Sequence, residues 1–162
     1  MQPLVILQLL VLLTVANGTP VLAKRLLGRR FSWPLDGGCR FFDGRPLFGP
    51  SKTLRGVVLS LGVTAALAPL VGLSPAIGVT VAAAAMLGDL VSSFVKRRMN
   101  RPSSSQALGL DQVPESLFPL LACRGALELS ALDILAAVGL FFIGELLASR
   151  VLYRLRIRDR PY

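Results

Sequence analysis

The chain has 162 residues, of which 53% are hydrophobic, and its formal net charge is +9. The apolar residues exceed the roughly 45–50% of a soluble domain and lie in long runs, which excludes an ordinary soluble protein and indicates an integral membrane protein. Histidine is absent and the two cysteines are far apart, which excludes imidazole catalysis, the usual catalytic triads and a structural zinc site. Because the basic clusters flank apolar runs, we expect membrane contact and no nucleic acid partner.

Five apolar segments follow one another along the chain. Spanning segments must satisfy their backbone hydrogen bonds internally, and none of these runs alternates as the strands of a membrane barrel do. We therefore predict an all-α, polytopic membrane helical bundle of about five transmembrane helices, forming a single domain over 1–162. The expected helices cover residues 3–23, 56–71, 75–95, 114–127 and 131–152.

The first expected helix, 3–23, ends at a basic cluster and has no basic residue before it. A cleaved signal peptide, the competing interpretation, would carry its cations ahead of the apolar run, whereas here Lys24 is the first. We therefore expect a retained helix, bent near its end by Pro20. The loop that follows, about 24–55, is basic and rich in Gly and Pro, which predicts tight turns and not a second core.

The second and third expected helices are joined by a short uncharged turn, residues 72–74, which predicts a tight helical hairpin. Small residues recur four apart in both helices, as at Gly62 and Ala66 or Ala84 and Gly88. Such spacing lets membrane helices approach closely, with simple space-filling as an equal alternative. The fourth expected helix is shorter than the roughly 20 residues that a full span needs, so we expect it to be tilted, buried or re-entrant.

Lys and Arg gather on one side of the predicted bundle. The loop from Lys24 to Arg55 carries eight of them and the loop at about 96–113 carries four, whereas the two opposite loops carry only Arg124. The C-terminal segment adds Arg150, Arg154, Arg156, Arg158 and Arg160. The positive-inside rule then predicts an external N-terminus, with the C-terminus and both long loops in the cytoplasm.

Asp89 is the acidic residue of most interest because it lies within an apolar segment. A carboxylate there is costly and marks a functional site by default. Ser92, Ser93 and Lys96 follow at i+3, i+4 and i+7, so they share its helix face. A structural ion pair with Lys96 or a loop arginine is the alternative to a metal ligand. Without histidine, a metal site must use oxygen ligands, which favours Mg²⁺ or a similar hard cation.

The surrounding sequence supports a functional role to different degrees for four further acidic residues. Asp111 follows the Asp89 helix on the same side, although an N-cap of the next helix is the alternative. Asp36 and Asp43 occur in Asp-Gly turns, for which turn formation is the stronger interpretation. Glu145 lies inside the last expected helix, and the sequence gives it no role.

Lys52, Thr53 and Arg55 open the second expected helix. Amides at a helix N-terminus with cations nearby form an anion site. The segment is not a phosphate-binding P-loop, because the lysine is displaced and no strand precedes it. Ordinary membrane-orienting charge is the alternative, as it is for Lys96, Arg97 and Arg98.

Taken in order, several short motifs resemble those of the CDP-archaeol synthases, which are related to the CDP-diacylglycerol synthases. The resemblance covers about residues 16–112. It rests on Asn17-Gly18-Thr19-Pro20, Asp43-Gly44-Arg45-Pro46, Lys52-Thr53-Leu54-Arg55-Gly56, Gly88-Asp89-Leu90-Val91-Ser92-Ser93 and Gly109-Leu110-Asp111-Gln112.

The resemblance implies an enzyme of the cell membrane, with its site facing the cytoplasm, that transfers CMP from CTP to a lipid phosphate. It implies Mg²⁺ as cofactor, pyrophosphate as product, and a place in phospholipid biosynthesis. Asp89 and Asp111 would hold the metal, and Lys52, Lys96 and Arg97 would serve catalysis by neutralising phosphate charge. The implied substrate-binding residues are Asn17, Thr19, Asp43, Thr53, Arg55, Ser92 and Ser93.

The acceptor stays open between an archaeal isoprenoid ether lipid and a diacyl phosphatidate, the substrate of a CDP-diacylglycerol synthase. A function of another class is a small membrane transporter that uses Asp89 as a relay, or a non-catalytic membrane protein. The transporter would show flux without a CTP requirement. The sequence leaves the oligomeric state open.

Overall fold

The computed structural model describes residues 1–154, which form five α-helices and one 3₁₀ helix. Within that range the prediction of an all-helical protein is confirmed, because only two isolated β-bridges occur, both in the loop after the first helix. Arg156, Arg158 and Arg160 of the basic tail lie outside the described residues. The elements are α1 (Pro3–Leu27), α2 (Leu54–Leu67), η1 (Ala68–Val71), α3 (Pro75–Arg98), α4 (Gln112–Cys123) and α5 (Ala131–Arg154).

The helix starts follow from local sequence. The Thr53 hydroxyl accepts a hydrogen bond from the Gly56 amide at the start of α2, and the Ser74 hydroxyl accepts one from the Ile77 amide at the start of α3. Both are N-caps that satisfy an amide left free by the first helical turn. Gly72 adopts φ 82° at the end of η1, a conformation that favours glycine, and so turns the chain into α3. The expected tight hairpin is observed.

Among the described residues, four helical segments are long and apolar enough to cross a membrane: Pro3–Leu27, Leu54–Val71, Pro75–Arg98 and Ala131–Val151. α4 differs from them, because its 12 residues extend only about 18 Å, against about 30 Å for a hydrocarbon core. It packs along α3 and α5. The expected short fourth helix is thus present, with one face buried against its neighbours and Val113 and Leu121 exposed on the other.

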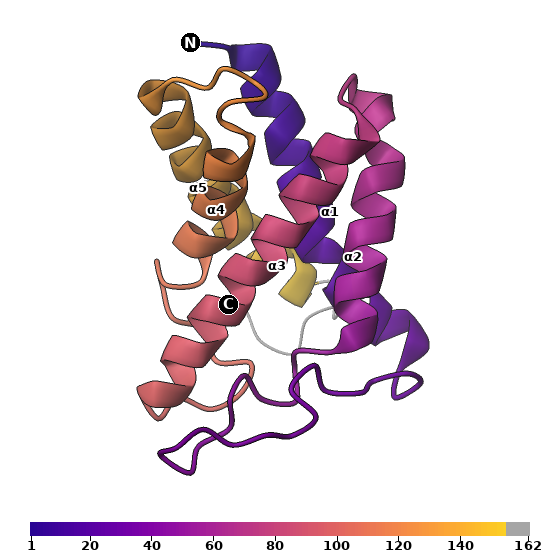
Figure 1. The fold of residues 1–162 in the computed structure, drawn as a ribbon, viewed down its shortest axis with the longest axis vertical. Helices are drawn as coiled ribbons and strands as arrows, with labels where there is room; N and C mark the ends of the chain where they lie inside the picture. Colours follow the sequence, from indigo (N-terminus) through magenta and orange to yellow (C-terminus); the bar gives the residue numbers. More distant parts are fainter. Residues whose placement is uncertain (155–162) are drawn as a thin grey trace.

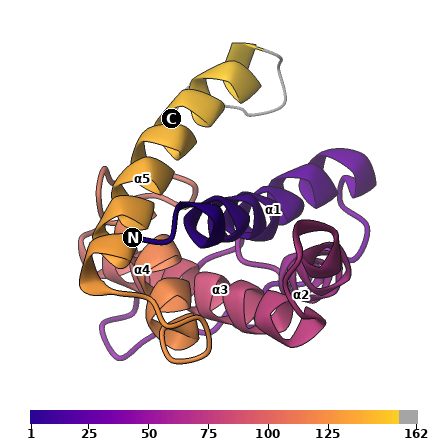
Figure 2. The same cartoon turned by 90° about the horizontal axis from the view of Figure 1, so that it is seen from above.

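The two long loops lie at one end of the bundle and the short connections at the other. Figure 1 shows loop 28–53 beneath the helices and loop 99–111 rising beside the lower part of α3, with the N-terminus, η1 and the α4–α5 connection at the opposite end. Seen from above, α5 begins beside α4 and α1, and its C-terminal half diverges from the other helices (Figure 2). The side that the charge pattern marks as basic is therefore one contiguous layer.

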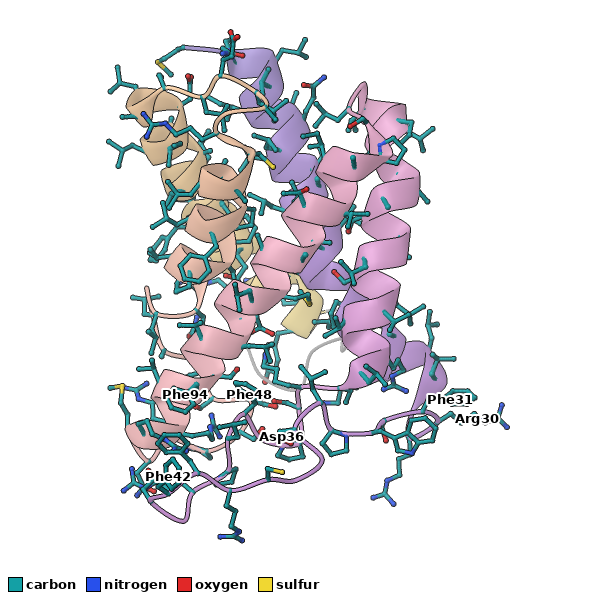
Figure 3. The ribbon with its side chains drawn as sticks, in the orientation of Figure 1. Arg30, Phe31, Asp36, Phe42, Phe48 and Phe94 are labelled. Atoms are coloured by element: carbon teal, nitrogen blue, oxygen red, sulfur yellow. The ribbon has the colours of Figure 1, made fainter. Side chains whose placement is uncertain are left out.

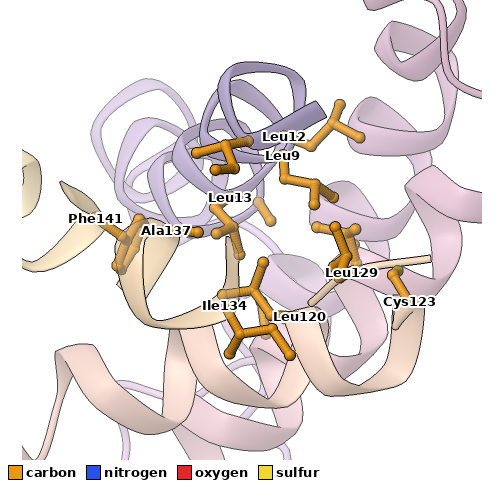
Figure 4. Close-up of a cluster of buried hydrophobic side chains, with 14 of the residues drawn as sticks. Leu9, Leu12, Leu13, Leu120, Cys123, Leu129, Ile134, Ala137 and Phe141 are labelled. Atoms are coloured by element: carbon orange, nitrogen blue, oxygen red, sulfur yellow. The ribbon is translucent and has the colours of Figure 1, made fainter. Parts of the chain in front are cut away.

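An apolar cluster joins α1, α4 and α5 in the half of the molecule away from the long loops (Figure 4). Leu9, Leu12 and Leu13 of α1 are fully buried there, as is the α4 residue Cys123. The other members shown are Leu120, Leu129, Ile134, Ala137 and Phe141. This packing fixes the relative positions of α1, α4 and α5. The arrangement of residues at the loop end of the bundle depends on those positions.

Glycines set two close helix–helix approaches. A Cβ atom at Gly78 would come within 2.7 Å of the Thr64 carbonyl oxygen on α2, and one at Gly88 would collide with the backbone of Pro114 and Glu115 on α4. A Cβ at Gly62 would meet nothing within 4 Å. The small-residue spacing therefore has a specific packing role at positions 78 and 88 and none at 62.

Candidate active site

A buried ion pair links the first long loop to the middle of α3. The Lys52 ammonium donates to the Asp89 carboxylate, and the two side chains are only 21% and 20% exposed. Burial lowers the pKa of Lys52, but the carboxylates of Asp89, Glu115 and Asp111 outweigh this and raise the pKa, so the amine stays charged. The partner of Asp89 is thus a lysine from a loop, 37 residues away, and not Lys96 of its own helix.

A second buried ion pair lies closer to the end of α3. The Lys96 Nζ is 2.6 Å from Oδ1 of Asp111, with side-chain exposures of 8% and 13%, and it also donates to the Ser105 carbonyl at 3.0 Å. The Asp111 Oδ2 accepts a hydrogen bond from the Ala107 amide at 2.8 Å. Asp111 occupies the N-cap position of α4, as the alternative predicted, but its side chain makes no capping hydrogen bond to the helix. As predicted, Asp111 lies on the same side of the bundle as Asp89.

Glu115, in the first turn of α4, brings a third carboxylate to this cluster. The residue is 8% exposed, and its carboxylate interacts electrostatically with that of Asp89. The close contact of Gly88 with the backbone at Glu115 explains the approach, because position 88 directly precedes Asp89. Two lysines and three carboxylates therefore form one polar cluster between the first loop, α3 and α4.

The chemistry of these donors fits a hard cation. In the described part of the chain no three Asp, Glu or Cys side chains converge on one point, as a closed all-protein site would require. Mg²⁺ is commonly held by only one or two carboxylates, with water and substrate phosphates completing its coordination. The adjacent carboxylates of Asp89 and Glu115 are the side chains that would hold it, with Asp111 one helical turn from Glu115.

An arginine-lined pocket of about 360 Å³ lies between the two long loops and the end of α3. Its cations are Arg45, Arg97 and Arg101, and Ser103 contributes a hydroxyl. No carboxylate is among its lining residues. Three guanidinium groups without a lining counter-charge favour a polyanionic ligand such as a phosphate chain.

The guanidinium groups that line this pocket donate hydrogen bonds to backbone carbonyls. Arg97 donates to the Pro102 carbonyl at 2.9 Å and Arg101 to the Gln106 carbonyl at 2.9 Å. The Arg97 Nε is buried without a hydrogen-bond partner in the described chain. Carbonyl bonds orient a guanidinium without cancelling its charge, so the pocket keeps its positive potential.

A clamp around Arg98 holds the first loop against α3. The guanidinium lies 4.8 Å from the ring centroids of both Phe41 and Phe94, and it donates to Asp43 at 2.9 Å and to the Pro46 carbonyl at 2.6 Å. Cation–π contacts to both rings, together with the ion pair to Asp43, hold the guanidinium in place. Asp43, predicted to bind substrate, is thereby engaged in holding its own loop.

Asp36 organises the same loop from inside. Its carboxylate accepts hydrogen bonds from the amides of Gly38, Phe48 and Gly49 at 3.0, 2.9 and 3.1 Å. Burial raises the pKa of Asp36, but these amide bonds outweigh it and lower the pKa. Figure 3 shows Asp36 and Phe48 beneath α3 on the same side as Phe94. The turn interpretation of Asp36 is confirmed, and the residue also ties two distant turns together.

The remaining predicted substrate residues bond locally in this structure. Asn17 and Thr19 donate to carbonyls one turn back in α1, and the Ser92 hydroxyl donates to the Asp89 carbonyl at 3.0 Å. Ser93 is 2% exposed on α3. Their roles toward substrate stay predictions. Thr53 caps α2, and Arg55 donates to the carbonyls of Gly28 and Arg30, away from the carboxylate cluster.

Sequence reasoning assigned no role to Glu115 or Arg45, and it left Arg98, with Lys96 and Arg97, as either an anion-binding or a membrane-orienting cation. Glu115 could have been found, because it follows Asp111 by four residues, the spacing that places two side chains on one helix face. The contacts of Arg45 and Arg98 could not, because their partners lie 52 to 55 residues away along the chain. No spacing rule connects residues so distant.

A solved structure entitled "Structural insight into an intramembrane enzyme for archaeal membrane lipids biosynthesis" superimposes on this chain with a TM-score of 0.69. The two share 27% sequence identity over 85% of this chain and 90% of the other. With the apolar bundle and its buried polar cluster, this likeness defines the class: an integral membrane enzyme of lipid biosynthesis.

The family follows from the sequence comparisons. The profile described as CarS-like, CDP-archaeol synthase, matches residues 4–162. The CDP-archaeol synthase of Pyrobaculum calidifontis is 39% identical over 91% of both chains, and that of Pyrobaculum aerophilum 35% over 91% of this chain and 92% of its own. The chain belongs to the CarS-like CDP-archaeol synthase family, and the predicted resemblance is confirmed.

Proposed function

We propose that this protein transfers CMP from CTP to a membrane lipid phosphate, with Mg²⁺ as cofactor and pyrophosphate as product. The observation that carries the proposal is the polar cluster of Lys52, Asp89, Lys96, Asp111 and Glu115 at the loop end of an apolar bundle. The arginine-lined pocket nearby supports it, because a nucleoside triphosphate needs both a cation site and a polyanion site.

The proposed reaction needs little covalent chemistry from the protein. An oxygen of the lipid phosphate attacks the α-phosphorus of CTP, and the bond from that phosphorus to the bridging oxygen breaks. Pyrophosphate leaves with the bonding electrons. The attacking oxygen is already anionic, so no general base is required, in keeping with a chain that lacks histidine. Positioning and charge neutralisation then account for the catalysis.

The residues divide this work by their charge. Asp89 and Glu115, with Asp111 close by, would hold Mg²⁺, which neutralises phosphate oxygens and orients them when bound. Lys52 and Lys96 supply compact positive charge beside the reacting phosphates. Arg45, Arg97 and Arg101 would bind the diphosphate end of CTP, the part that departs.

Pyrophosphate release by the purified protein in detergent tests this function. The assay supplies CTP, Mg²⁺ and a panel of lipid phosphates, with archaeal-type isoprenoid ether lipids and diacyl phosphatidates as separate arms. We expect release that requires all three components and stops on chelation of the metal. Arg124→Gln, at the opposite end of the molecule, is the matched control and should retain full activity. No release with any acceptor refutes the proposal.

We further propose that the loop end faces the cytoplasm, where CTP is available. Support comes from the eight cations of residues 24–55 and the four of residues 96–113. Reporters fused to either terminus provide the test, with the N-terminal one expected outside and the C-terminal one inside the cell. Both reporters on one side would contradict this orientation.

A further inference from the structure

The turn after α1 presents aromatic and cationic side chains to its surroundings. Phe31 and Trp33 are 64% and 67% exposed, and their rings meet edge to face with centroids 6.4 Å apart. Arg29 and Arg30 precede them and are also exposed. Figure 3 shows Arg30 and Phe31 at the edge of the loop layer, separated from Phe42, Phe48 and Phe94. We call residues 29–33 the aromatic–arginine rim.

The rim is held in place by defined hydrogen bonds. The Arg55 guanidinium donates to the Gly28 carbonyl at 3.1 and 3.2 Å and also to the Arg30 carbonyl. Phe31 has φ 55°, a conformation that a bulky side chain rarely adopts. Strained backbone persists where the surrounding structure imposes it and often marks a functional contact. Here the strained residue, Phe31, and its neighbour Trp33 both expose their aromatic rings.

The cations of the rim have no counter-charge within residues 1–154, the part of the chain that the structure describes. No acidic residue occurs between positions 1 and 35 of the sequence. Asp36, the first, is occupied by three backbone amides. Arg29 and Arg30 form no ion pair with any residue of the described chain. The rim therefore combines exposed rings with uncompensated guanidinium groups.

We propose that the aromatic–arginine rim binds the phosphate headgroups of anionic lipids in the adjoining leaflet. α1 is a candidate membrane span, so the turn directly after it lies at the membrane surface. Tyr and Trp rings favour that interface, and nearby arginines attract anionic lipids. The 80% exposed Leu26, at the end of the same helix, adds an apolar contact for the acyl region.

Backbone pairing connects the rim to the carboxylate cluster. The Leu54 amide donates to the Trp33 carbonyl at 3.1 Å, and the Leu35 amide donates to the Lys52 carbonyl at 2.8 Å. An antiparallel bridge joins Pro34 and Thr53 between them. A lipid held at the rim is thus bound beside the segment that carries Lys52. The role of the rim in supplying acceptor rests on the proposed function, whereas headgroup binding does not.

The test uses Trp33, which is the only tryptophan of the chain and therefore a specific fluorescent probe. The full-length protein is reconstituted in vesicles that contain brominated phosphatidylglycerol or, at the same mole fraction, brominated phosphatidylcholine. We expect stronger quenching by the anionic lipid, because each arginine near the surface favours it by roughly fivefold. Equal quenching by the two lipids would overturn the proposal.

Variants then assign the preference to the rim. Arg29→Gln and Arg30→Gln, singly and together, should reduce the difference between the two lipids, and Arg124→Gln should leave it unchanged. A preference that survives the double variant in folded protein refutes the assignment, as does quenching of Trp33 by aqueous iodide to the level of free tryptophan.

Competition distinguishes the sources of the phosphate group. Unbrominated phosphatidate, a phosphomonoester like the proposed acceptor, or unbrominated phosphatidylglycerol is added to the vesicles. Relief of quenching by phosphatidate alone assigns the rim to acceptor-type headgroups, and relief by both assigns it to anionic lipids generally. Relief by neither overturns the proposal. If the pyrophosphate assay fails while the lipid preference holds, the proposed function falls and the rim stands.

Discussion

The two ends of this molecule are held together by different forces. Away from the long loops, α1, α4 and α5 meet through fully buried leucines such as Leu12 and Leu120. At the loop end, the contacts are ion pairs and arginine–carbonyl hydrogen bonds between segments far apart in sequence. Packing supports the position of the helices, and the polar end supplies the chemistry. Substitutions at the two ends should therefore separate stability from activity.

Asp89→Asn should have the largest effect on activity. It removes a carboxylate charge from the proposed cation site and leaves Lys52 without its ionic partner. We expect pyrophosphate release to fall by about 100-fold or more, the scale seen when one preorganised electrostatic group is lost. The folded state is monitored by Trp33 fluorescence. Full activity in this variant would disprove the role of Asp89 in cation binding.

Leu13→Ala should lower the stability of the fold and leave the activity of the folded protein unchanged. Leu13 is fully buried in the apolar cluster, so its truncation leaves a cavity. A buried Leu→Ala substitution in a soluble protein costs about 2–5 kcal/mol. We expect a value near the lower end, because helix association in a bilayer gains no free energy from transferring apolar side chains out of water. Activity per folded molecule should be retained. Leu7→Ala, at a 59% exposed position of the same helix, is the control and should leave thermal stability unchanged.

Gly88→Ala should affect both ends, because it acts on the α3–α4 contact. The added Cβ would collide with the backbone at Pro114 and Glu115, displacing the Glu115 carboxylate from Asp89. We expect a loss of about 1–3 kcal/mol in stability, with weakened dependence on Mg²⁺ concentration. The matched control is Gly62→Ala, where a Cβ meets nothing within 4 Å. Identical behaviour of the two variants would contradict the role of this contact.

Acidification should loosen the first long loop before it affects the apolar cluster. The pKa of Asp36 is lowered, so its stabilising contribution is present above its ordinary value of 3.8 and is lost as the pH falls below that value. Limited proteolysis within residues 36–49 should accelerate there. Asp36→Asn should show the faster cleavage already at neutral pH. A cleavage rate independent of pH in the unsubstituted protein would argue against this role.

The Asp43–Arg98 clamp should give the smallest effect. The side chains are 38% and 21% exposed, so a double-mutant cycle of Asp43→Asn and Arg98→Gln should show a coupling of about 0.2–1 kcal/mol. Because the clamp positions the loop that carries Arg45, we expect a raised KM for CTP with kcat nearly unchanged. A lowered kcat at unchanged KM would instead place Asp43 or Arg98 at the reacting atoms.

Much of the fold could be predicted because helix-forming information is local. Apolar runs placed the five helices within a few residues of their observed bounds. The pairing of Asp89 with Lys52 and of Asp111 with Lys96 could not be predicted, because these residues meet only through tertiary contact. The Gly88 pattern suggested a close approach, but only the packed structure identifies α4 as the neighbour.

The shortness of α4 has a consequence for where water meets hydrocarbon. α4 begins beside Gly88 and Asp89, roughly 14 Å along α3 from its end at Arg98. Loop 99–111 must therefore climb back along α3 before α4 starts. Non-helical backbone at that depth is tolerated only against protein or a hydrated cavity. Loop 99–111 meets this requirement against α3, because Lys96 donates to the Ser105 carbonyl at 3.0 Å and pairs with Asp111. Ionic groups therefore lie deeper in the bundle than the loop-side end of α3.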